Sequence, residues 1–195
     1  MDPRVHVLVF DGLADWEAAY ALAELRRSGA LDVVAVGFTI DAITTMGGLR
    51  VLPAVALPAV APADVRLFLL PGGDLWEGEY PREAVETVLR KLVEGGITVA
   101  AICGATLALA RAGLLDDRRH TSNAPEYLTQ HASNYKGSAS YVAQLATRDR
   151  GVITASGLGS VEFAREIFEE LGVLNASDRS IWFEMFKHGK LPPAA

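Results

Sequence analysis

Five short apolar runs constrain the fold of this chain more than any other feature. They cover residues 5–10, 32–38, 65–70, 97–102 and 152–155. Apolar runs of this length are typical of strands that are covered on both faces of a sheet. Patterns typical of helices lie between them. This alternation predicts the α/β class, with a mostly parallel sheet and helices on both of its faces.

The predicted helices are short as well. They cover residues 16–28, 82–94, 105–112 and 161–171, and a further short helix around residues 182–186 is expected to pack on the body of the protein. Residues 39–62 alternate short β-like pieces with glycine and proline, which indicates a β-hairpin or an excursion at the edge of the sheet. The sequence shows no internal repeat and no linker, so we expect a single domain over residues 1–195.

Composition limits the partners and the compartment. The chain has 195 residues, of which 50% are apolar, and a net charge of −6. An acidic chain is poorly suited to a phosphate backbone, so we expect no nucleic-acid partner. One cysteine excludes an internal disulfide and a CxxC metal site, and we expect neither metal nor cofactor. We find no signal-peptide pattern and no apolar run of about 20 residues, so we expect a cytoplasmic protein without a membrane contact.

The single cysteine, Cys103, stands where a predicted strand passes directly into a predicted helix. Such a passage forces a sharp turn, which projects the side chain at its apex into the crevice beyond the strand ends. The N-terminus of the following helix carries partial positive charge, so we expect it to lower the pKa of the thiol. The alternative is a small buried apolar residue at the end of a core strand. Gly104, directly after the cysteine, favours the reactive thiol.

The motifs around this turn resemble the DJ-1/PfpI family. The resemblance is carried by residues 70–73 (LPGG) and 100–105 (AAICGA), and it extends to residues 15–17 (DWE), 120–123 (HTSN), 153–157 (ITASG) and 162–164 (EFA). It therefore spans nearly the whole chain. It implies a flavodoxin-like three-layer sandwich, related to class I glutamine amidotransferases, in which Cys103 occupies a nucleophile elbow.

The resemblance also implies roles for individual residues. Cys103 would be the nucleophile, and the glutamate of the first helix that bonds its sulfur would be Glu17. A carboxyl group beside a thiolate must hold a proton in order to donate that bond, because two adjacent anions repel each other. The oxyanion-binding amides would belong to Gly73 and Gly104. We assign Gly72 and Asn123 to the same oxyanion- and substrate-binding set.

One position departs from the family pattern. Many members carry a histidine downstream of the elbow helix, and the matching residue here is Asn123, while His120 lies three residues earlier. A Cys-His pair therefore lacks its general base, which argues against peptidase or amidase chemistry. We expect His120 on a solvated connector, Asp15 as a helix cap or solvated acid, and Trp76 and Tyr80 as loop aromatics that line the mouth of the crevice.

These residues predict a cysteine-dependent enzyme acting on a small carbonyl or amide substrate. Hydrolase, glyoxalase-type lyase and hydratase chemistry all fit the same set of residues. A second hypothesis is a redox-sensing stress-response protein whose cysteine is oxidised without turnover. A third is an interaction module with a vestigial crevice. Related proteins are usually homodimers, so we expect a homodimer that uses apolar residues of the excursion 39–62.

Overall fold

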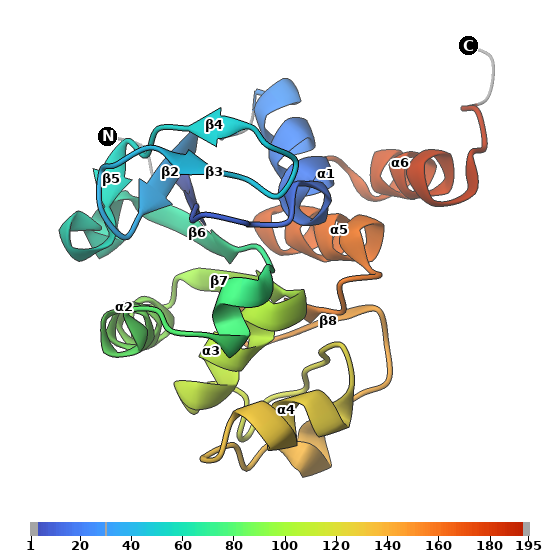
Figure 1. Ribbon diagram of the computed structural model, residues 1–195. Coiled ribbons are helices and arrows are strands. Elements are labelled where there is room, and N and C mark those ends of the chain that lie inside the picture. The colour runs from blue at the N-terminus through green and yellow to red at the C-terminus, as the bar shows by residue number, and fades with distance from the viewer. Residues whose placement is uncertain (1–3, 30, 193–195) are drawn as a thin grey trace.

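The structure is a computed structural model that describes residues 4–29 and 31–192 (Figure 1). Its main sheet has seven strands in the order β5-β2-β1-β6-β7-β9-β8. Their bounds are β1 Arg4–Leu8, β2 Val33–Gly37, β5 Val55–Ala56, β6 Val65–Leu70, β7 Thr98–Ile102, β8 Ala146–Asp149 and β9 Val152–Ala155. All neighbouring pairs are parallel except β8 with β9, which is antiparallel. The α/β prediction of a mostly parallel sheet is therefore confirmed.

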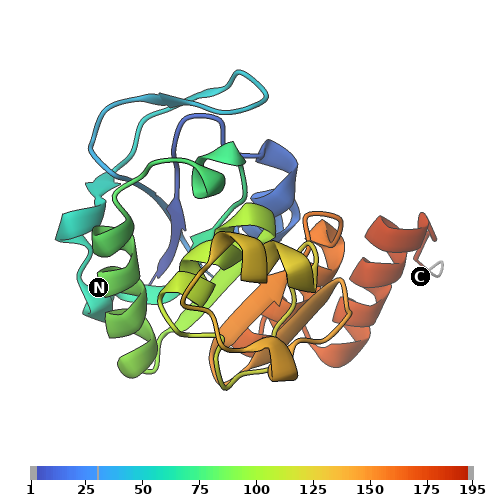
Figure 2. The same cartoon turned by 60° about the horizontal axis from the view of Figure 1, so that its bottom comes forward.

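Helices cover both faces of the sheet and give three layers (Figures 1 and 2). Helices α1 (Asp15–Arg27) and α5 (Ser160–Leu171) pack side by side on one face, and α6 (Ala176–His188) packs outside α5. Helices α2 (Arg82–Glu94) and α3 (Thr106–Arg111) lie on the other face, and α4 (Pro125–His131) packs against α3. Strand β7, which lies between β6 and β9, is buried along its whole length, as its apolar sequence predicts.

Most predicted elements agree with the structure within two residues, and the exceptions have physical causes. The excursion forms the antiparallel hairpin β3 (Ile43–Thr44) and β4 (Arg50–Val51), and β5 then returns to the edge of the main sheet. Helix α6 has 13 residues and is not the short helix expected. Helix α4 and the edge strand β8 were not predicted. Each has few buried residues, so its sequence shows little apolar periodicity.

The order of the strands brings the segments that follow four of them to the same end of the sheet. Strands β1, β6, β7 and β9 are consecutive neighbours and parallel, so their carboxyl ends lie side by side. The segments that leave these ends carry Glu17, Gly72, Cys103 and Gly157. Ligands of open α/β sheets bind beyond the carboxyl ends of the strands, so we take this end of the sheet as the candidate site. Among the described helices, none is both long and apolar enough to cross a bilayer.

Candidate functional site

Cys103 occupies the sharp turn that its sequence predicts. Ile102 is still extended, at φ −124° and ψ 145°, whereas Cys103 has a left-handed φ of 59°. A positive φ is strained for a residue with a side chain and often marks a functional turn. The short 3₁₀ turn η4 (Cys103–Ala105) then leads into α3. The Thr106 hydroxyl holds the turn, since it donates to the Cys103 carbonyl at 2.7 Å.

Glu17 reaches this turn from the first helix. Its side chain is 2% exposed, and its Oε2 accepts a hydrogen bond from the backbone N–H of Gly72 at 2.6 Å. The carboxyl group also hydrogen-bonds the thiol of Cys103. A Cβ placed on Gly157 would lie 3.0 Å from Sγ of Cys103 and 3.3 Å from Oε1 of Glu17. A side chain at position 157 would therefore crowd the thiol–carboxyl pair, and the sequence had not assigned Gly157 a role in the site.

Asn123 contacts the sulfur from the other side. Its Nδ2 lies 3.4 Å from Sγ of Cys103, and its Oδ1 accepts a hydrogen bond from the N–H of Gly157 at 3.0 Å. The second bond fixes the orientation of the amide, so that its NH₂ group faces the sulfur. An amide can donate to the sulfur but cannot take a proton from it at neutral pH. Asn123 therefore stands in the structure as a donor.

The two glycine turns place further donors near the sulfur. The N–H of Gly104 faces the thiol. Within the described residues, the N–H of Gly73 donates to no protein acceptor. Gly73 has a φ of 149°, and a Cβ there would lie 2.8 Å from the Gly12 carbonyl oxygen. The structure thus brings together all six residues that the sequence singled out: Glu17, Gly72, Gly73, Cys103, Gly104 and Asn123.

The ionisation of this pair differs from the expectation. Burial, followed by the charge of Glu17, outweighs the donors around the sulfur and raises the pKa of Cys103 to about 11. Burial also raises the pKa of Glu17. The helix N-terminus therefore does not lower the pKa of the thiol while Glu17 is ionised. Because two adjacent anions are disfavoured, the pair retains one proton at neutral pH, and the thiolate forms when that proton sits on Glu17.

We expect the variant Glu17→Gln to separate the effect of burial on the pKa of Cys103 from the effect of the Glu17 charge. Glutamine keeps the size of the side chain and a donor to the sulfur but carries no charge, so the pKa of Cys103 should fall clearly below 11. The rate of iodoacetamide alkylation against pH, followed by intact mass, measures this pKa. An inflection that stays near pH 11 in the variant would show that burial alone controls the thiol.

Two other residues, His120 and Trp76, lie where the sequence did not place them. His120 is fully buried and not on a solvated connector; its Nδ1 bonds the Arg118 carbonyl at 2.7 Å and its Nε2 bonds the Tyr135 hydroxyl at 2.6 Å. Trp76 is also fully buried, and its Nε1 donates to the Pro71 carbonyl. For Asp15, the helix-cap alternative is wrong and the solvated acid fits, since its partly exposed carboxylate accepts from the N–H of Gly47 in the β3–β4 turn at 2.6 Å.

Two further polar residues, Tyr127 and Glu77, lie beside the cysteine turn. The Tyr127 hydroxyl donates to Oε1 of Glu77 at 3.0 Å, and a Cβ on Gly104 would lie 3.2 Å from the same hydroxyl. Tyr127 comes from α4 and Glu77 from the 3₁₀ turn η3 (Asp74–Glu77). The sequence missed them because α4 shows little periodicity and because nothing in the chain order indicates that the two segments meet.

Buried Arg111 ties these two segments to the elbow helix. Its guanidinium donates to the Trp76 carbonyl at 2.8 Å, to the Tyr80 hydroxyl at 2.9 Å and to the His131 carbonyl at 2.9 Å. Trp76 precedes Glu77, and the ring of His131 contacts the ring of Tyr127. Arg111 therefore fixes where the Tyr127–Glu77 pair lies relative to Cys103.

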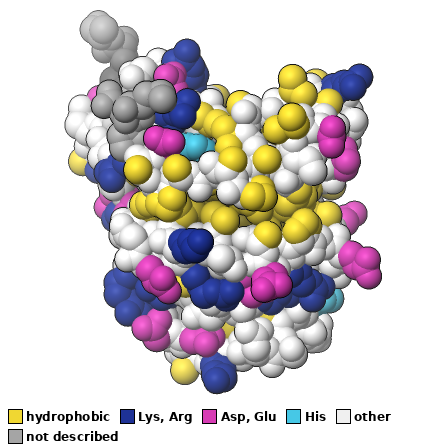
Figure 3. All heavy atoms as spheres, turned by 90° about the vertical axis from the view of Figure 1, so that its left-hand side faces the viewer, with side chains coloured by type: hydrophobic (Ala, Val, Ile, Leu, Met, Phe, Trp, Pro, Cys, Tyr) yellow, Lys and Arg dark blue, Asp and Glu magenta, His cyan; other side chains and the backbone are white. Residues whose placement is uncertain are grey.

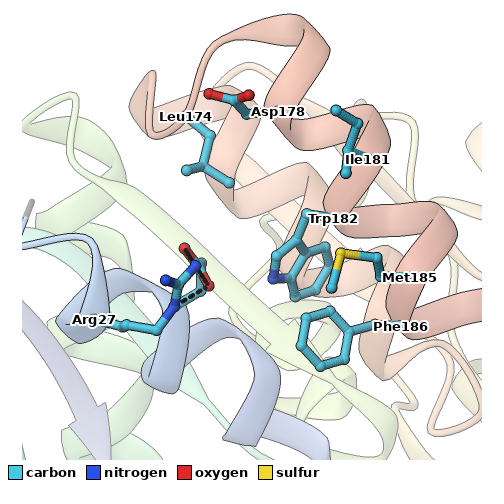
Figure 4. A pocket seen from close by; sticks show the side chains of 8 residues that line it. Arg27, Leu174, Asp178, Ile181, Trp182, Met185 and Phe186 are labelled. Carbon is cyan, nitrogen blue, oxygen red and sulfur yellow. Dashed lines mark hydrogen bonds and ion pairs between the residues drawn. The ribbon is translucent and has the colours of Figure 1, made fainter. Parts of the chain in front are cut away.

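A larger cavity, of about 560 Å³, lies elsewhere, between the C-terminal half of α1 and helix α6 (Figure 4). Its lining includes Trp182, Met185 and Phe186, and its polar side is the Glu24–Arg27 ion pair. None of the residues that line it is a nucleophile, and it lies at the opposite end of α1 from Glu17. Size alone therefore does not make it the reactive site, and we assign the chemistry to the Cys103 turn.

Comparison with known proteins agrees with the fold and identifies the family. The chain is 37% identical over 194 residues to "Uncharacterized protease YoaZ" of Bacillus subtilis, which covers 96% of this chain and 92% of the relative. It is 32% identical over 119 residues to "Deglycase TK1284" of Thermococcus kodakarensis, which covers 61% of this chain and 71% of the relative. A crystal structure of a ThiJ/PfpI family protein from Bacillus anthracis superimposes with a TM-score of 0.89 at 36% identity, covering 97% of this chain and 92% of that one. Residues 3–170 match the DJ-1/PfpI family, and the chain belongs to that family.

Proposed function

We propose that this protein is a cysteine-dependent enzyme that acts on small carbonyl compounds, with Cys103 as its nucleophile. The observation that carries the proposal is the Cys103 turn, where a strained, half-buried thiol meets Glu17, whose pKa is raised by burial, and the N–H of Gly104. Relatives named as a protease and as a deglycase support a hydrolase or lyase in general terms. The choice of a carbonyl substrate over an amide rests on Asn123.

Amide hydrolysis requires a group that protonates the leaving amine and then activates water. Asn123 contacts the sulfur at the position where such a histidine would lie, and it does neither. Addition to an aldehyde or ketone requires only one proton. The sulfur forms a bond to the carbonyl carbon, the π electrons of the C=O bond move to oxygen, and Glu17 transfers its proton to that oxygen. The product is a neutral hemithioacetal and a Glu17 carboxylate.

Backbone donors support the charge that develops on the oxygen. The N–H of Gly104 faces the sulfur, and we assign the N–H of Gly73 to the same oxyanion-binding set; donors fixed in the backbone stabilise an oxyanion without reorganising. Gly72 anchors Glu17 through its own N–H. The same arrangement serves a glyoxalase-type lyase, whose reaction begins with addition to a carbonyl group.

Consumption of a small dicarbonyl tests this function. We expect the wild type to consume methylglyoxal and Cys103→Ala to lose at least a thousandfold of that rate, because the covalent step is removed. The rate is measured as loss of the dicarbonyl against a no-enzyme control, with Cys103→Ala checked for folding by circular dichroism. Equal consumption by wild type and folded Cys103→Ala would rule out a nucleophilic role for the cysteine.

Redox sensing in the cytoplasm is the second candidate function. The donors of Asn123 and Gly104 that face the sulfur would also bond the oxygens of a sulfinic acid. Mild peroxide followed by intact mass distinguishes the candidates. Addition of two oxygens at Cys103 without any carbonyl turnover would favour the sensor over the enzyme.

We further propose that two copies of the chain associate through the excursion. Four large apolar side chains there are exposed: Ile40 at 65%, Met46 at 47%, Leu49 at 64% and Leu52 at 71%. The face that carries β5 and α2 also shows a band of hydrophobic side chains (Figure 3). Exposed apolar surface of this extent is typical of an interaction site.

Sedimentation tests the association. We expect the wild type to sediment as a dimer and the double variant Leu49→Asp, Leu52→Asp as a monomer of 20.8 kDa, since two buried charges would oppose docking. Leu191→Asp is the matched control, because Leu191 is 89% exposed and lies outside the excursion. A wild type that sediments as a monomer would overturn the proposal.

A further inference from the structure

The hydrogen bonds of the Tyr127–Glu77 pair decide what the pair can bind. The single phenolic proton of Tyr127 is donated to Glu77 at 3.0 Å. What remains available is a lone pair on the phenol oxygen and the second carboxylate oxygen, Oε2, of the exposed Glu77. The pair therefore presents two acceptors and a negative charge. It fits a group that donates hydrogen bonds and repels a carboxylate.

Its location places these acceptors beside the reacting carbon of a substrate. The Tyr127 hydroxyl would be 3.2 Å from a Cβ on Gly104, the residue whose N–H faces the sulfur. A thiolate at Cys103 would raise the pKa of the Tyr127 hydroxyl. A substrate atom one or two bonds from the carbonyl carbon would thus lie against the pair.

We propose that Tyr127 and Glu77 form a specificity subsite of the Cys103 site that selects carbonyl compounds carrying a hydroxyl or amino group next to the carbonyl. This inference rests on the proposed function. Tyr127 acts here through its lone pair and not as a base, because burial, followed by the Glu77 carboxylate, raises the pKa of its hydroxyl and keeps it protonated at neutral pH. The bond to Glu77 in turn fixes the direction of the lone pair.

The surrounding charges favour the same class of substrate. The charged groups that act on Tyr127 are Glu77, Cys103 and Arg111. Arg111 is 9% exposed, and its guanidinium donates to two backbone carbonyls and the Tyr80 hydroxyl. It is therefore not available to bind a substrate carboxylate. The subsite therefore distinguishes hydroxycarbonyl compounds from oxo acids by charge as well as by hydrogen bonding.

Protection of Cys103 from iodoacetamide by three two-carbon aldehydes tests the proposal. Glycolaldehyde carries the adjacent hydroxyl, acetaldehyde lacks it, and glyoxylate carries a carboxylate instead. We expect Tyr127→Phe to weaken protection by glycolaldehyde about tenfold, the effect of one hydrogen bond, and protection by acetaldehyde less than twofold. Glu77→Gln should weaken protection by glycolaldehyde and strengthen protection by glyoxylate, because it removes the repelling charge.

Tyr20→Phe is the matched control, because Tyr20 lies on α1 and its ring contacts Trp182 and Phe186 instead of the site. We expect it to change protection by none of the three aldehydes. Equal losses for glycolaldehyde and acetaldehyde in Tyr127→Phe, or no gain for glyoxylate in Glu77→Gln, would overturn the subsite and leave the proposed function standing. If no aldehyde protects wild-type Cys103, both proposals fail.

Discussion

Gly72→Ala is expected to destabilise the protein by about 1–3 kcal/mol and to speed alkylation of Cys103, because it moves away the Glu17 charge that raises the pKa of the thiol. A Cβ at this position would collide with Oε2 of Glu17 and lie 2.7 Å from Cβ of Cys103. Neither neighbour can easily yield, since Glu17 is buried and bonded to the N–H of residue 72, and Cys103 belongs to a strained turn. One methyl group would thus displace the carboxyl group from the sulfur.

Gly78→Ala is the control for this change. Gly78 lies on the same connection, has a φ of −95°, and a Cβ there would meet only the Leu75 carbonyl, at 3.5 Å. Urea unfolding followed by fluorescence gives the free energies of unfolding, and intact mass gives the alkylation rates. If Gly72→Ala matched Gly78→Ala in both measurements, the close approach of Glu17 and Cys103 to residue 72 would be wrong.

Arg111→Met is expected to destabilise the protein by about 2–4 kcal/mol and to remove the discrimination between glycolaldehyde and acetaldehyde. Methionine retains the apolar stem but donates no hydrogen bond, so the carbonyls of Trp76 and His131 lose a charged donor. The gain from no longer burying a cation offsets only part of this loss. The segments that carry Glu77 and Tyr127 would then lose their common anchor.

Arg26→Met is the matched control, because Arg26 is exposed and pairs with Asp32, which is exposed as well. Surface ion pairs of this kind contribute little, so the change should stay within about 0.5 kcal/mol. Arg111→Lys adds a second comparison: one ammonium cannot reach the carbonyls of both segments, so its stability should lie between that of wild type and methionine. An Arg111→Met variant as stable as Arg26→Met would contradict the anchoring role.

The elements that local pattern predicts best are those that the sheet buries on both faces. Strands β6 and β9 and helix α2 have the bounds that the sequence indicates. An apolar run or an amphipathic repeat can be recognised from neighbouring residues alone. Helix α4 and strand β8 lie at the edge of the fold and bury few residues, so their sequences resemble loops. The missed half of the crevice, with Tyr127, lies on one of these elements.

The same division applies to the site. Cys103 could be identified from its place between an apolar run and a helix, because that junction is a local property of the chain. Glu17 and Asn123 came from the family resemblance, and the structure brings both to the sulfur. Gly157 follows a predicted strand and could be placed at the crevice, but its contact with the sulfur could not be predicted. Glu77 and Tyr127 had no local signal, since what matters about each is a neighbour far away in the sequence.

The sequence by itself determined the α/β class, the strand-to-helix turn at Cys103 and the absence of a histidine at position 123. These follow from residue types and their order alone. Only the tertiary structure decided the ionisation of the thiol, because the pKa of Cys103 depends on burial and on the Glu17 carboxylate beside it. It also decided that Asn123 is a donor to the sulfur and that His120 is a buried structural residue. Hydrogen bonds and desolvation depend on distances between remote residues, which become fixed only when the sheet assembles.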